Sequence, residues 1–536
     1  MKAGKLLQVS VIYLQLLLAL AITIPAQAQP HFRVAHSFFG SVTIYASATL
    51  ADGGTVSCGI FLSPDGLIVA TNKDGSIRWV KTLEVETEPL YLYSVRESGN
   101  GSIIVSGLLL TGPQYYLPAA FCFSPSGTLL WYKFYELGAS GYFRDAYPTG
   151  DGGYLFVGSR STGLMVKTDS LGVPRWSLQA TFKDQSIKGE YIRLAERADS
   201  SFIILAALHL SPIGVEDPSN ILSITSVSDA GNIKDQVFIK DTAANLSAQT
   251  ILSCSNGDIM LGGSLDPFSG FNTPLLVRLS PNGAFKWATT ASAFASMQIL
   301  SLLEEPQGSV IGLSGPVTSV NTDALSLLEI GENGNVLDAA LVSRFRPFFG
   351  ALSMHKNNPT AYSLVLTTFD TSRPPAVDVS NFTMPLIGCN TSPALVSTSP
   401  IQLIDTVLEY SHEQVPVTVL TNIPLKIDSI TVPSFTLCSS DNVEPVVSLP
   451  PMAPYPNPVQ SDAPITIDLP DDYRGSVSVL LKDITGRTVY TSRMESRLPD
   501  HHALIPTSGL TAGVYAIELL DTITSAILWH GKVIVE

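Results

Sequence analysis

The sequence predicts an all-β protein whose larger part is a seven-bladed β-propeller, and the pattern is compatible with six to eight blades. The first observation behind this prediction is composition, because 45% hydrophobic and 14% charged residues with 40 Gly and 36 Pro suit many short strands joined by tight turns. The second is a Gly-x-x-x-Trp motif that recurs along the chain. The third is its spacing, since the motif glycines follow one another after 52, 45, 59, 52 and 51 residues, the length of a four-stranded blade.

The motif marks one strand of each repeat and the turn before it. Four copies are complete: Gly75 with Trp79, Gly127 with Trp131, Gly172 with Trp176, and Gly283 with Trp287. Two more copies keep the glycine, at Gly231 and Gly334, but carry Asp235 and Asp338 in place of the tryptophan. In a strand, the tryptophan shares a face with the residue two positions earlier, which is usually apolar. We expect it to dock between adjacent blades, and we expect the two aspartates to be exposed.

An apolar run precedes each copy of the motif. Examples are residues 103–105, 154–157, 202–205 and 259–261. We interpret these runs as the first strand of each repeat, buried on both faces by the neighbouring blades. A fainter seventh repeat covers residues 360–366 and 377–386, and residues 32–44 are expected to supply a strand that closes the ring. The predicted propeller spans residues 29–391.

The Gly-x-x-x-Trp spacing is similar to the tryptophan-docking motif of pyrroloquinoline-quinone-type propellers. The resemblance covers the motif alone and implies shared blade packing. Residues that would bind that cofactor are not identifiable, so no cofactor is expected.

The pattern changes after the propeller. Residues 392–440 contain alternating strands without the blade motif and are expected to form a small β appendage. Five cysteines leave at least one thiol unpaired, and Cys389 with Cys438, which bracket this segment, is the best candidate disulfide. Residues 441–454 contain four prolines and are predicted to be a semi-rigid linker.

The first residues have the features of a secretory leader. Lys2 and Lys5 precede an apolar run, and Ala26-Gln27-Ala28 stands before Gln29, so residues 1–28 are a predicted signal peptide cleaved between Ala28 and Gln29. No later stretch is apolar enough for a transmembrane helix. The formal charge is −15, and loss of the two leader lysines makes it −17 because residues 1–28 contain no Asp or Glu. This charge disfavours nucleic-acid partners.

The last residues form an alternating strand pattern, and short motifs punctuate it. These are Tyr455-Pro456-Asn457-Pro458 at its start, a turn at Gly486, a segment that contains Gly513 and Tyr515, and a final strand that begins at Lys532. In order and spacing they resemble the C-terminal sorting domain (type A) of the type IX secretion system of the Bacteroidota. The resemblance implies an Ig-like β-sandwich at residues 455–536. It also implies that the type IX machinery is a partner and carries the protein from the periplasm to the cell surface or the medium.

The sequence contains no motif for catalysis, cofactor binding or metal binding, since H-E-x-x-H, P-loop and G-x-S-x-G patterns are all absent. We therefore expect an exported propeller that binds or scaffolds glycans or proteins. The alternative is a secreted glycan-active hydrolase or lyase whose site lies in the propeller channel. The alternative requires acidic or basic residues that converge on the mouth of the channel.

Overall fold

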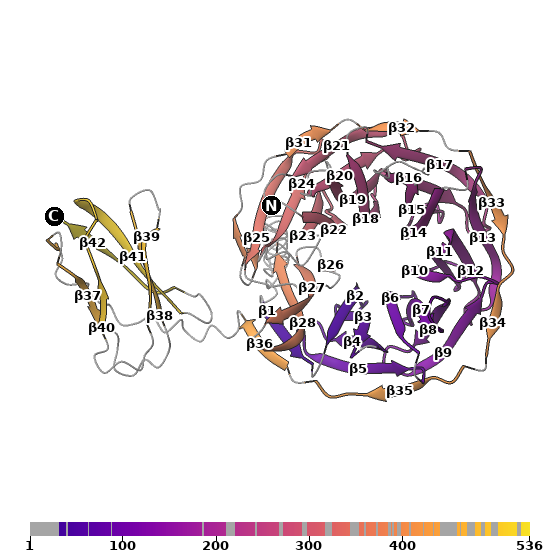
Figure 1. Cartoon of the computed structure of the whole chain (residues 1–536), viewed down its shortest axis with the longest axis horizontal. Helices are drawn as coiled ribbons and strands as arrows, with labels where there is room; N and C mark the ends of the chain where they lie inside the picture. The colour runs from indigo at the N-terminus through magenta and orange to yellow at the C-terminus, as the bar shows by residue number, and fades with distance from the viewer. Residues whose placement is uncertain are drawn as a thin grey trace, which may run out of the picture. The chain divides into compact units, whose positions relative to one another are not determined.

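Seven antiparallel sheets surround a common axis in the first of two structural units, which comprises residues 1–439; the second unit comprises residues 440–536 (Figure 1). This computed structural model describes residues 32–38, 41–62, 64–86, 88–184, 187–210, 220–241, 244–266, 272–291, 297–316, 324–343, 353–358, 361–370, 373–383, 387–388, 391–393, 398–401, 403–406, 409–421, 423–432, 434–439, 458–460, 463–468, 477–483, 488–494, 502–521 and 527–536. Every regular element within these ranges is a β-strand. The predicted all-β class and the seven blades are confirmed.

Each of the first six blades contains a four-stranded meander whose earliest strand lies nearest the axis (Figure 1). The first three comprise β2 (Val42–Thr49), β3 (Thr55–Phe61), β4 (Asp65–Thr71) and β5 (Ile77–Glu84); β6 (Leu90–Glu97), β7 (Ile103–Leu110), β8 (Tyr116–Phe123) and β9 (Leu129–Glu136); and β10 (Tyr142–Pro148), β11 (Tyr154–Arg160), β12 (Thr162–Thr168) and β13 (Pro174–Phe182). The next three comprise β14 (Ile187–Glu196), β15 (Phe202–Leu210), β16 (Asn220–Val227) and β17 (Ile233–Lys240); β18 (Asn245–Ser253), β19 (Ile259–Asp266), β20 (Thr273–Leu279) and β21 (Phe285–Ala291); and β22 (Met297–Glu304), β23 (Val310–Pro316), β24 (Ala324–Ile330) and β25 (Val336–Ser343).

The seventh blade joins two distant parts of the chain. It contains β26 (Ser353–Asn358), β27 (Ala361–Asp370), β28 (Arg373–Thr383) and the short β29 (Ile387–Gly388), and its next strand is β1 (Phe32–Ser37). Strand β1 pairs antiparallel with β28, so the beginning of the propeller sequence completes the last blade. A strand from residues 32–44 therefore closes the ring, as the sequence predicts.

The apolar runs are placed differently from the prediction. They form the second strand of each blade rather than the first, as β7 does between β6 and β8. The reason is that the middle strands of a blade are covered by both neighbouring blades, whereas the innermost strand also borders the axis. The innermost strands therefore have a more polar sequence, as β6 (LYLYSVRE) has beside β7 (IIVSGLLL).

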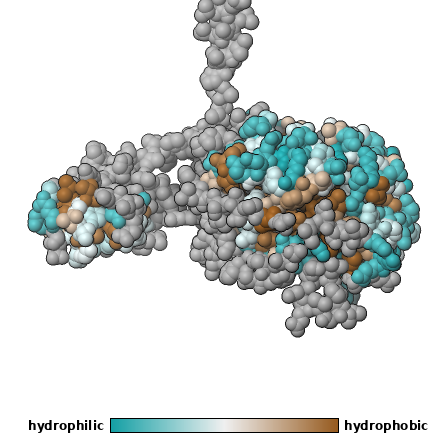
Figure 2. All heavy atoms as spheres, turned by 90° about the horizontal axis from the view of Figure 1, so that it is seen from above, coloured by the Kyte–Doolittle hydropathy of each residue, from teal (hydrophilic) through white to brown (hydrophobic). Residues whose placement is uncertain are grey.

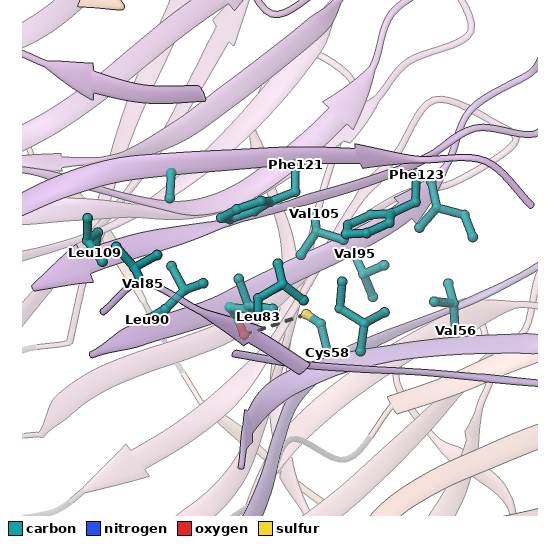
Figure 3. Close-up of a cluster of buried hydrophobic side chains, with 14 of the residues drawn as sticks. Val56, Cys58, Leu83, Val85, Leu90, Val95, Val105, Leu109, Phe121 and Phe123 are labelled. Carbon is teal, nitrogen blue, oxygen red and sulfur yellow. Dashed lines mark hydrogen bonds between the residues drawn. The ribbon is translucent and has the colours of Figure 1, made fainter. Parts of the chain in front are cut away.

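The hydrophobic core of the ring lies between the blades. Seven clusters of buried side chains each combine residues of two adjacent blades. Side chains alternate between the clusters, since Ile103 and Val105 belong to the interface with the first blade, and Ile104 belongs to the interface with the third. Figure 3 shows the cluster between the first two blades, where the Cys58 Sγ lies 3.5 Å from the Leu92 carbonyl oxygen.

The motif tryptophans connect each blade to the next one. Trp79, Trp131, Trp176 and Trp287 each donate an indole hydrogen bond to a backbone carbonyl in the motif turn of the following blade: Pro125 at 3.0 Å, Ser170 at 3.0 Å, Asp229 at 3.0 Å and Glu332 at 2.7 Å. The indole also lies against the glycine of that turn. A Cβ added to Gly127 would lie 2.7 Å from Trp79, and the φ of Gly127 is 78°, so two separate constraints require glycine there.

The blade that carries Asp235 uses other residues for the same two contacts. Arg197 donates a hydrogen bond to the Pro281 carbonyl at 2.7 Å, as the indole does in the other blades. Val237 covers the motif glycine of the next blade, since a Cβ added to Gly283 would lie 2.5 Å from Val237. Asp235 itself is exposed. The degenerate copy of the motif therefore keeps the interblade contact and replaces only the side chains that make it.

The expected β appendage does not form. Residues 391–439 instead run once around the ring and add a fifth strand to the outer edge of every blade (orange in Figure 1). We call this segment the belt. Its strands are β30 (Thr391–Pro393), β31 (Thr398–Ile401), β32 (Ile404–Thr406), β33 (Tyr410–Gln414), β34 (Thr418–Leu420), β35 (Lys426–Ser429) and β36 (Ser434–Ser439). They pair with β25, β21, β17, β13, β9, β5 and β1, so the belt follows the blades in reverse order.

The belt covers the unpaired backbone groups of seven outer strands, which would otherwise be free to pair with another chain. It also buries apolar side chains against the blades, among them Leu403, Val415 and Val432. The belt residue His412 is half-buried and hydrogen bonds to the Tyr191 hydroxyl at 2.9 Å. Burial lowers the pKa of His412 to about 4, so the imidazole of His412 is neutral at physiological pH. On the side of the ring that Figure 2 shows, the described residues are mainly hydrophilic, with smaller apolar areas among them.

A buried histidine lies where the ring closes. His36 on β1 makes hydrogen bonds to Gly75 in the first blade and to Ser434 of the belt, each at 2.8 Å. The Gly75 carbonyl can only accept, so Nε2 carries the proton and Nδ1 accepts from the Ser434 hydroxyl. Burial lowers the pKa of His36, and the bond to Gly75 partly opposes this. One neutral side chain thus joins the closing strand, the belt and the first blade.

Three sequence predictions concern residues outside the described ranges. These are the leader at residues 1–28 with its cleavage position, Cys389 of the proposed disulfide with Cys438, and the linker at residues 441–454. They remain predictions.

The C-terminal unit consists of two sheets. One pairs β37 (Ile465–Asp468) with β40 (His502–Ile505), and the other has the order β39 (Thr488–Met494), β38 (Val477–Lys482), β41 (Gly513–Asp521) and β42 (Ile527–Val535). A single apolar cluster takes residues from both sheets, including Ile465, Leu481, Ile517 and Val533. This is the predicted β-sandwich.

The tryptophan contact predicts that substitutions at equivalent motif positions change the free energy of unfolding by unequal amounts. The substitution Trp79→Ala removes the hydrogen-bond donor to the Pro125 carbonyl and leaves Gly127 uncovered. It should therefore lower the free energy of unfolding by roughly 3 kcal/mol. Asp235→Ala, at the same position of the fourth blade, should change it by less than about 0.5 kcal/mol because the side chain is exposed. Urea unfolding followed by circular dichroism checks both. Equal midpoints for the two variants would contradict the docking role.

Candidate functional site

The innermost strands of the first six blades are bulged at equivalent positions. In each, one residue has no partner on the second strand, and these residues are Tyr45, Tyr93, Arg144, Ile192, Gln249 and Leu300. A bulge redirects the side chain of the extra residue away from the regular alternation of the strand. The bulge therefore recurs at one position of the innermost strand, and the residue that it displaces differs from blade to blade.

Small residues opposite the bulges make this geometry possible. The second strand carries Gly59, Gly107, Gly158 and Gly263 in the first, second, third and fifth blades, and a Cβ at any of them would lie 1.8–1.9 Å from a carbonyl oxygen of the innermost strand. At Gly107 that oxygen belongs to Tyr91. No side chain fits at such a distance, so glycine at these positions permits the bulge.

Three of the bulge residues lie together with two neighbours in what we call the axial cluster: Tyr45, Tyr93, Tyr142, Arg144 and Glu190. The Tyr45 and Tyr93 rings meet edge to face with centroids 5.2 Å apart, and the Tyr93 and Tyr142 centroids are 6.3 Å apart. The Arg144 guanidinium lies over the Tyr93 ring, 4.9 Å from its centroid, and the Tyr142 hydroxyl donates to Glu190. All five side chains are half-buried.

This cluster borders the axis because its residues stand on the innermost strands β2, β6, β10 and β14 (Figure 1). Burial raises the pKa of Tyr45, and Arg144, two blades further on, opposes that rise. Burial likewise raises the pKa of Tyr93 to about 12; Arg144 opposes the rise and Glu190, again two blades away, contributes to it. Burial and Glu190 also raise the pKa of Tyr142. The three phenols are therefore protonated at neutral pH and can donate hydrogen bonds.

A buried carboxylate holds the strands behind the cluster in place. Asp145 accepts hydrogen bonds from Ser94 at 2.6 Å, Arg96 at 3.2 Å and the Leu194 backbone at 3.1 Å, so it links the second, third and fourth blades. Burial would raise the pKa of Asp145, but Arg96 and Arg193 outweigh it and hold the pKa below its usual value. Burial lowers the pKa of Arg193 to about 10, which still leaves it charged at neutral pH. These contacts fix the position of β10, which carries Arg144.

The axial cluster offers aromatic faces, hydroxyl donors, one guanidinium and one carboxylate acceptor. Within the described ranges, no group of three or more His, Cys, Asp or Glu residues could hold a metal ion. Cys58, Cys122 and Cys254 are buried and free, and burial raises the pKa of Cys254 to about 12, so none is an activated thiol. This set of groups suits binding of a polar ligand with an apolar face.

A cavity of about 640 Å³ lies on the rim of the ring, apart from the axial cluster. It is bordered by β13, the start of β14 and the belt strand β33, and an ion pair between Lys183 and Glu409, 2.5 Å long, spans part of it. We call it the rim pocket. Its lining is mixed in charge and includes Phe182 and Tyr410, which are paired in register between β13 and β33.

The motif residues that the sequence singles out do not belong to the axial cluster. Gly75, Gly127, Gly172 and Gly283 with their tryptophans lie in the outer part of the blades, where they organise packing. Sequence reasoning missed Tyr45, Tyr93, Arg144 and Glu190. Two signals could have revealed Tyr93 and Arg144: aromatic and charged residues shortly before the apolar runs at 103–105 and 154–157, as in residues 91–97 and 142–147, and a glycine shortly after each of these two runs.

The predicted sorting motif lies in the C-terminal unit. Tyr515 is buried, and its hydroxyl donates to the Thr511 carbonyl at 2.7 Å. Gly513 opens β41, Lys532 lies in β42, and Pro458 is exposed beside Val459, which pairs with Val535. Tyr455, Pro456, Asn457 and Gly486 lie outside the described residues. The start of the unit is thus tied directly to its last strand.

Residues 453–536 match the family described as secretion system C-terminal sorting domain. The C-terminal unit is a type IX sorting domain. This domain indicates that the protein is exported and then attached to the cell surface or released, and that the type IX machinery handles it. None of the described residues belongs to a helix that could cross a membrane.

The sorting domain accounts for the end of the chain, and the remaining comparisons concern the ring. No curated protein matches the chain. Among solved structures, a polysaccharide lyase described as an ulvan lyase has 10% identity and a TM-score of 0.40, over 67% of this chain and 96% of the other. A protein of unknown function from Dyadobacter fermentans has 8% identity and a TM-score of 0.39, over 65% and 97%. Prolyl oligopeptidase B from Galerina marginata has 10% identity and a TM-score of 0.38, over 68% and 51%. Similarity at this level assigns no activity to the axial cluster.

The glycine opposite the Tyr93 bulge provides a test of the bulged geometry. Gly107→Ala should lower the free energy of unfolding by more than about 3 kcal/mol, because the new methyl group would collide with the Tyr91 carbonyl. Gly99→Ala, in a turn of the same blade with no atom within 4 Å of the new Cβ, should be nearly neutral. Urea unfolding of both variants makes the comparison. A Gly107→Ala protein as stable as the control would mean that the second blade has no such bulge.

Proposed function

We propose that the exported ring is a glycan-binding module and that the axial cluster is its binding site. The observation that supports this most is the pair of bulges that bring Tyr45 and Tyr93 into edge-to-face contact beside the axis. Tyrosine combines an apolar ring, which can pack against the C–H face of a sugar, with a hydroxyl that can bond to sugar hydroxyls. Both rings are half-buried, so each keeps an exposed part for a ligand.

The rigidity of the site supports the same function. The tyrosines stand on strands rather than loops, and the Asp145 hydrogen bonds tie three neighbouring blades together behind them. Side chains held on strands lose little conformational freedom on binding, which favours affinity. Delivery to the cell surface or the medium by the sorting domain places this site where glycans are present.

The carboxylates near the axis favour binding over hydrolysis. A glycosidase needs a pair of carboxyl groups in which one can exchange protons with the substrate. Asp145 is committed to three hydrogen bonds with its pKa held low, and Glu190 accepts from the Tyr142 hydroxyl. Both carboxylates therefore serve better as fixed structural or hydrogen-bonding groups.

The proposal predicts that loss of one aromatic ring abolishes most of the affinity. A glycan array probed with the full mature chain should identify bound oligosaccharides, and calorimetric titration should then show at least a tenfold loss for Tyr93→Ala. Tyr93→Phe should keep most of the affinity because it keeps the ring. Leu130→Ala is the control, since Leu130 is 54% exposed on the outer strand β9.

Two results would contradict the proposal. One is unchanged glycan affinity in Tyr93→Ala with the fold intact by circular dichroism. The other is an array without any bound glycan, accompanied by capture of a surface protein through the rim pocket, which would favour a protein-binding role.

A further inference from the structure

Three arginines lie around the axial cluster, and they differ in their partners. Arg96 bonds to Asp145 at 3.2 Å and to the Ala146 carbonyl at 2.9 Å. Arg193 bonds to the Ile192 carbonyl at 3.0 Å and is stabilised by the charge of Asp145. Arg144 has no ion pair and no hydrogen bond within the described part of the chain, and its Nε is buried without a partner.

We propose that Arg144 is an anion-recognition residue and that the axial site selects saccharides that carry a carboxylate or sulfate group. This inference rests on the proposed glycan-binding function and names the chemical class of the ligand. A planar guanidinium presents two parallel N–H groups that match the oxygens of a carboxylate or a sulfate. A bound anion would supply the partner that the buried Nε of Arg144 lacks.

The surroundings of Arg144 favour this role. Its guanidinium lies 4.9 Å from the centre of the Tyr93 ring, which fixes the plane of the guanidinium without neutralising its charge. Arg144 stands on β10, the innermost strand of its blade, at the residue where that strand is bulged. An anionic group bound to Arg144 would thus lie beside the rings of Tyr45 and Tyr93, where the proposed sugar stacks.

The charges also suggest an orientation for the ligand. Glu190 accepts a hydrogen bond from Tyr142 and repels anions on its side of the cluster, while its remaining lone pairs can accept from neutral sugar hydroxyls. The chain as a whole carries a formal charge of −15, so its long-range field does not attract polyanions. Selectivity for an acidic sugar must therefore come from direct contact, and Arg144 is the residue placed to make it.

Matched pairs of oligosaccharides test the inference on the full mature chain. The first pair is an oligogalacturonate and its methyl ester, which differ only in the carboxylate charge. The second pair is a sulfated galactan oligosaccharide and its desulfated form. Calorimetric titration should show at least tenfold tighter binding of the charged member in one pair or both, and the pair that shows it identifies the group.

The variants assign that preference to one side chain. Arg144→Gln should remove the preference, because it should weaken binding of the charged member at least tenfold more than binding of the neutral member, and Arg144→Lys should restore the preference only in part because lysine lacks the paired donors. Lys188→Gln removes the same charge from the rim pocket, where Lys188 is exposed, and should leave the preference unchanged.

The outcomes separate this inference from the function on which it rests. Equal binding of charged and neutral members by the wild type, or a preference that survives in Arg144→Gln, would overturn the role of Arg144 and leave glycan binding in place. Absence of binding to all four oligosaccharides and to a glycan array would overturn both. The wild-type comparison of matched ligands remains decisive even if an Arg144 variant fails to fold.

Discussion

A blade of this protein can bury both of its faces only when it has a neighbour on each side, so the ring must close for any of its cores to form. Closure uses both ends of the propeller sequence, because β1 completes the last blade and the belt follows it with β36. His36 joins these two strands to the first blade. Around the rest of the ring, each motif tryptophan rests on the glycine of the next blade, and the belt pairs with every outer edge. The positions of the innermost strands, and with them the axial cluster, depend on this closed arrangement.

The axial cluster shows how a repeat fold can carry a site that is not repeated. The bulge recurs in six blades, but the residue it presents differs each time, from Tyr45 and Tyr93 to Arg144 and then to Ile192, Gln249 and Leu300. The bulge is therefore common to six blades, whereas the aromatic and charged bulge residues occur only in the first three. Aromatic and charged groups gather on the first four blades, and aliphatic and amide side chains follow. Such a division gives a ligand a defined place and direction.

The sequence predicted the architecture better than the site. The Gly-x-x-x-Trp spacing gave the blades because a two-sided burial pattern and a positive-φ glycine leave clear traces, and the sorting domain was recognisable from its motifs. The sequence predicts an appendage in place of the belt because strands of three to six residues fit any sheet edge, and because the belt pairings join residues up to some four hundred positions apart, as with Cys438 and Arg33. Tyr45, Tyr93 and Arg144 were missed because a bulge changes the direction of a side chain without changing the sequence pattern. The role of Asp145 is not predictable either, since its partners come from the two neighbouring blades.

The central claim is that the ligand of this exported ring binds beside the axis, at the bulges of the first three blades. Hydrogen–deuterium exchange of the full mature chain, measured with and without a saturating acidic oligosaccharide, tests it most directly. The account predicts slower exchange in peptides that cover β2, β6 and β10, with little change in β13 and the belt. Protection confined to the rim pocket between β13, β14 and β33, or no protection around the axis at saturation, would contradict it.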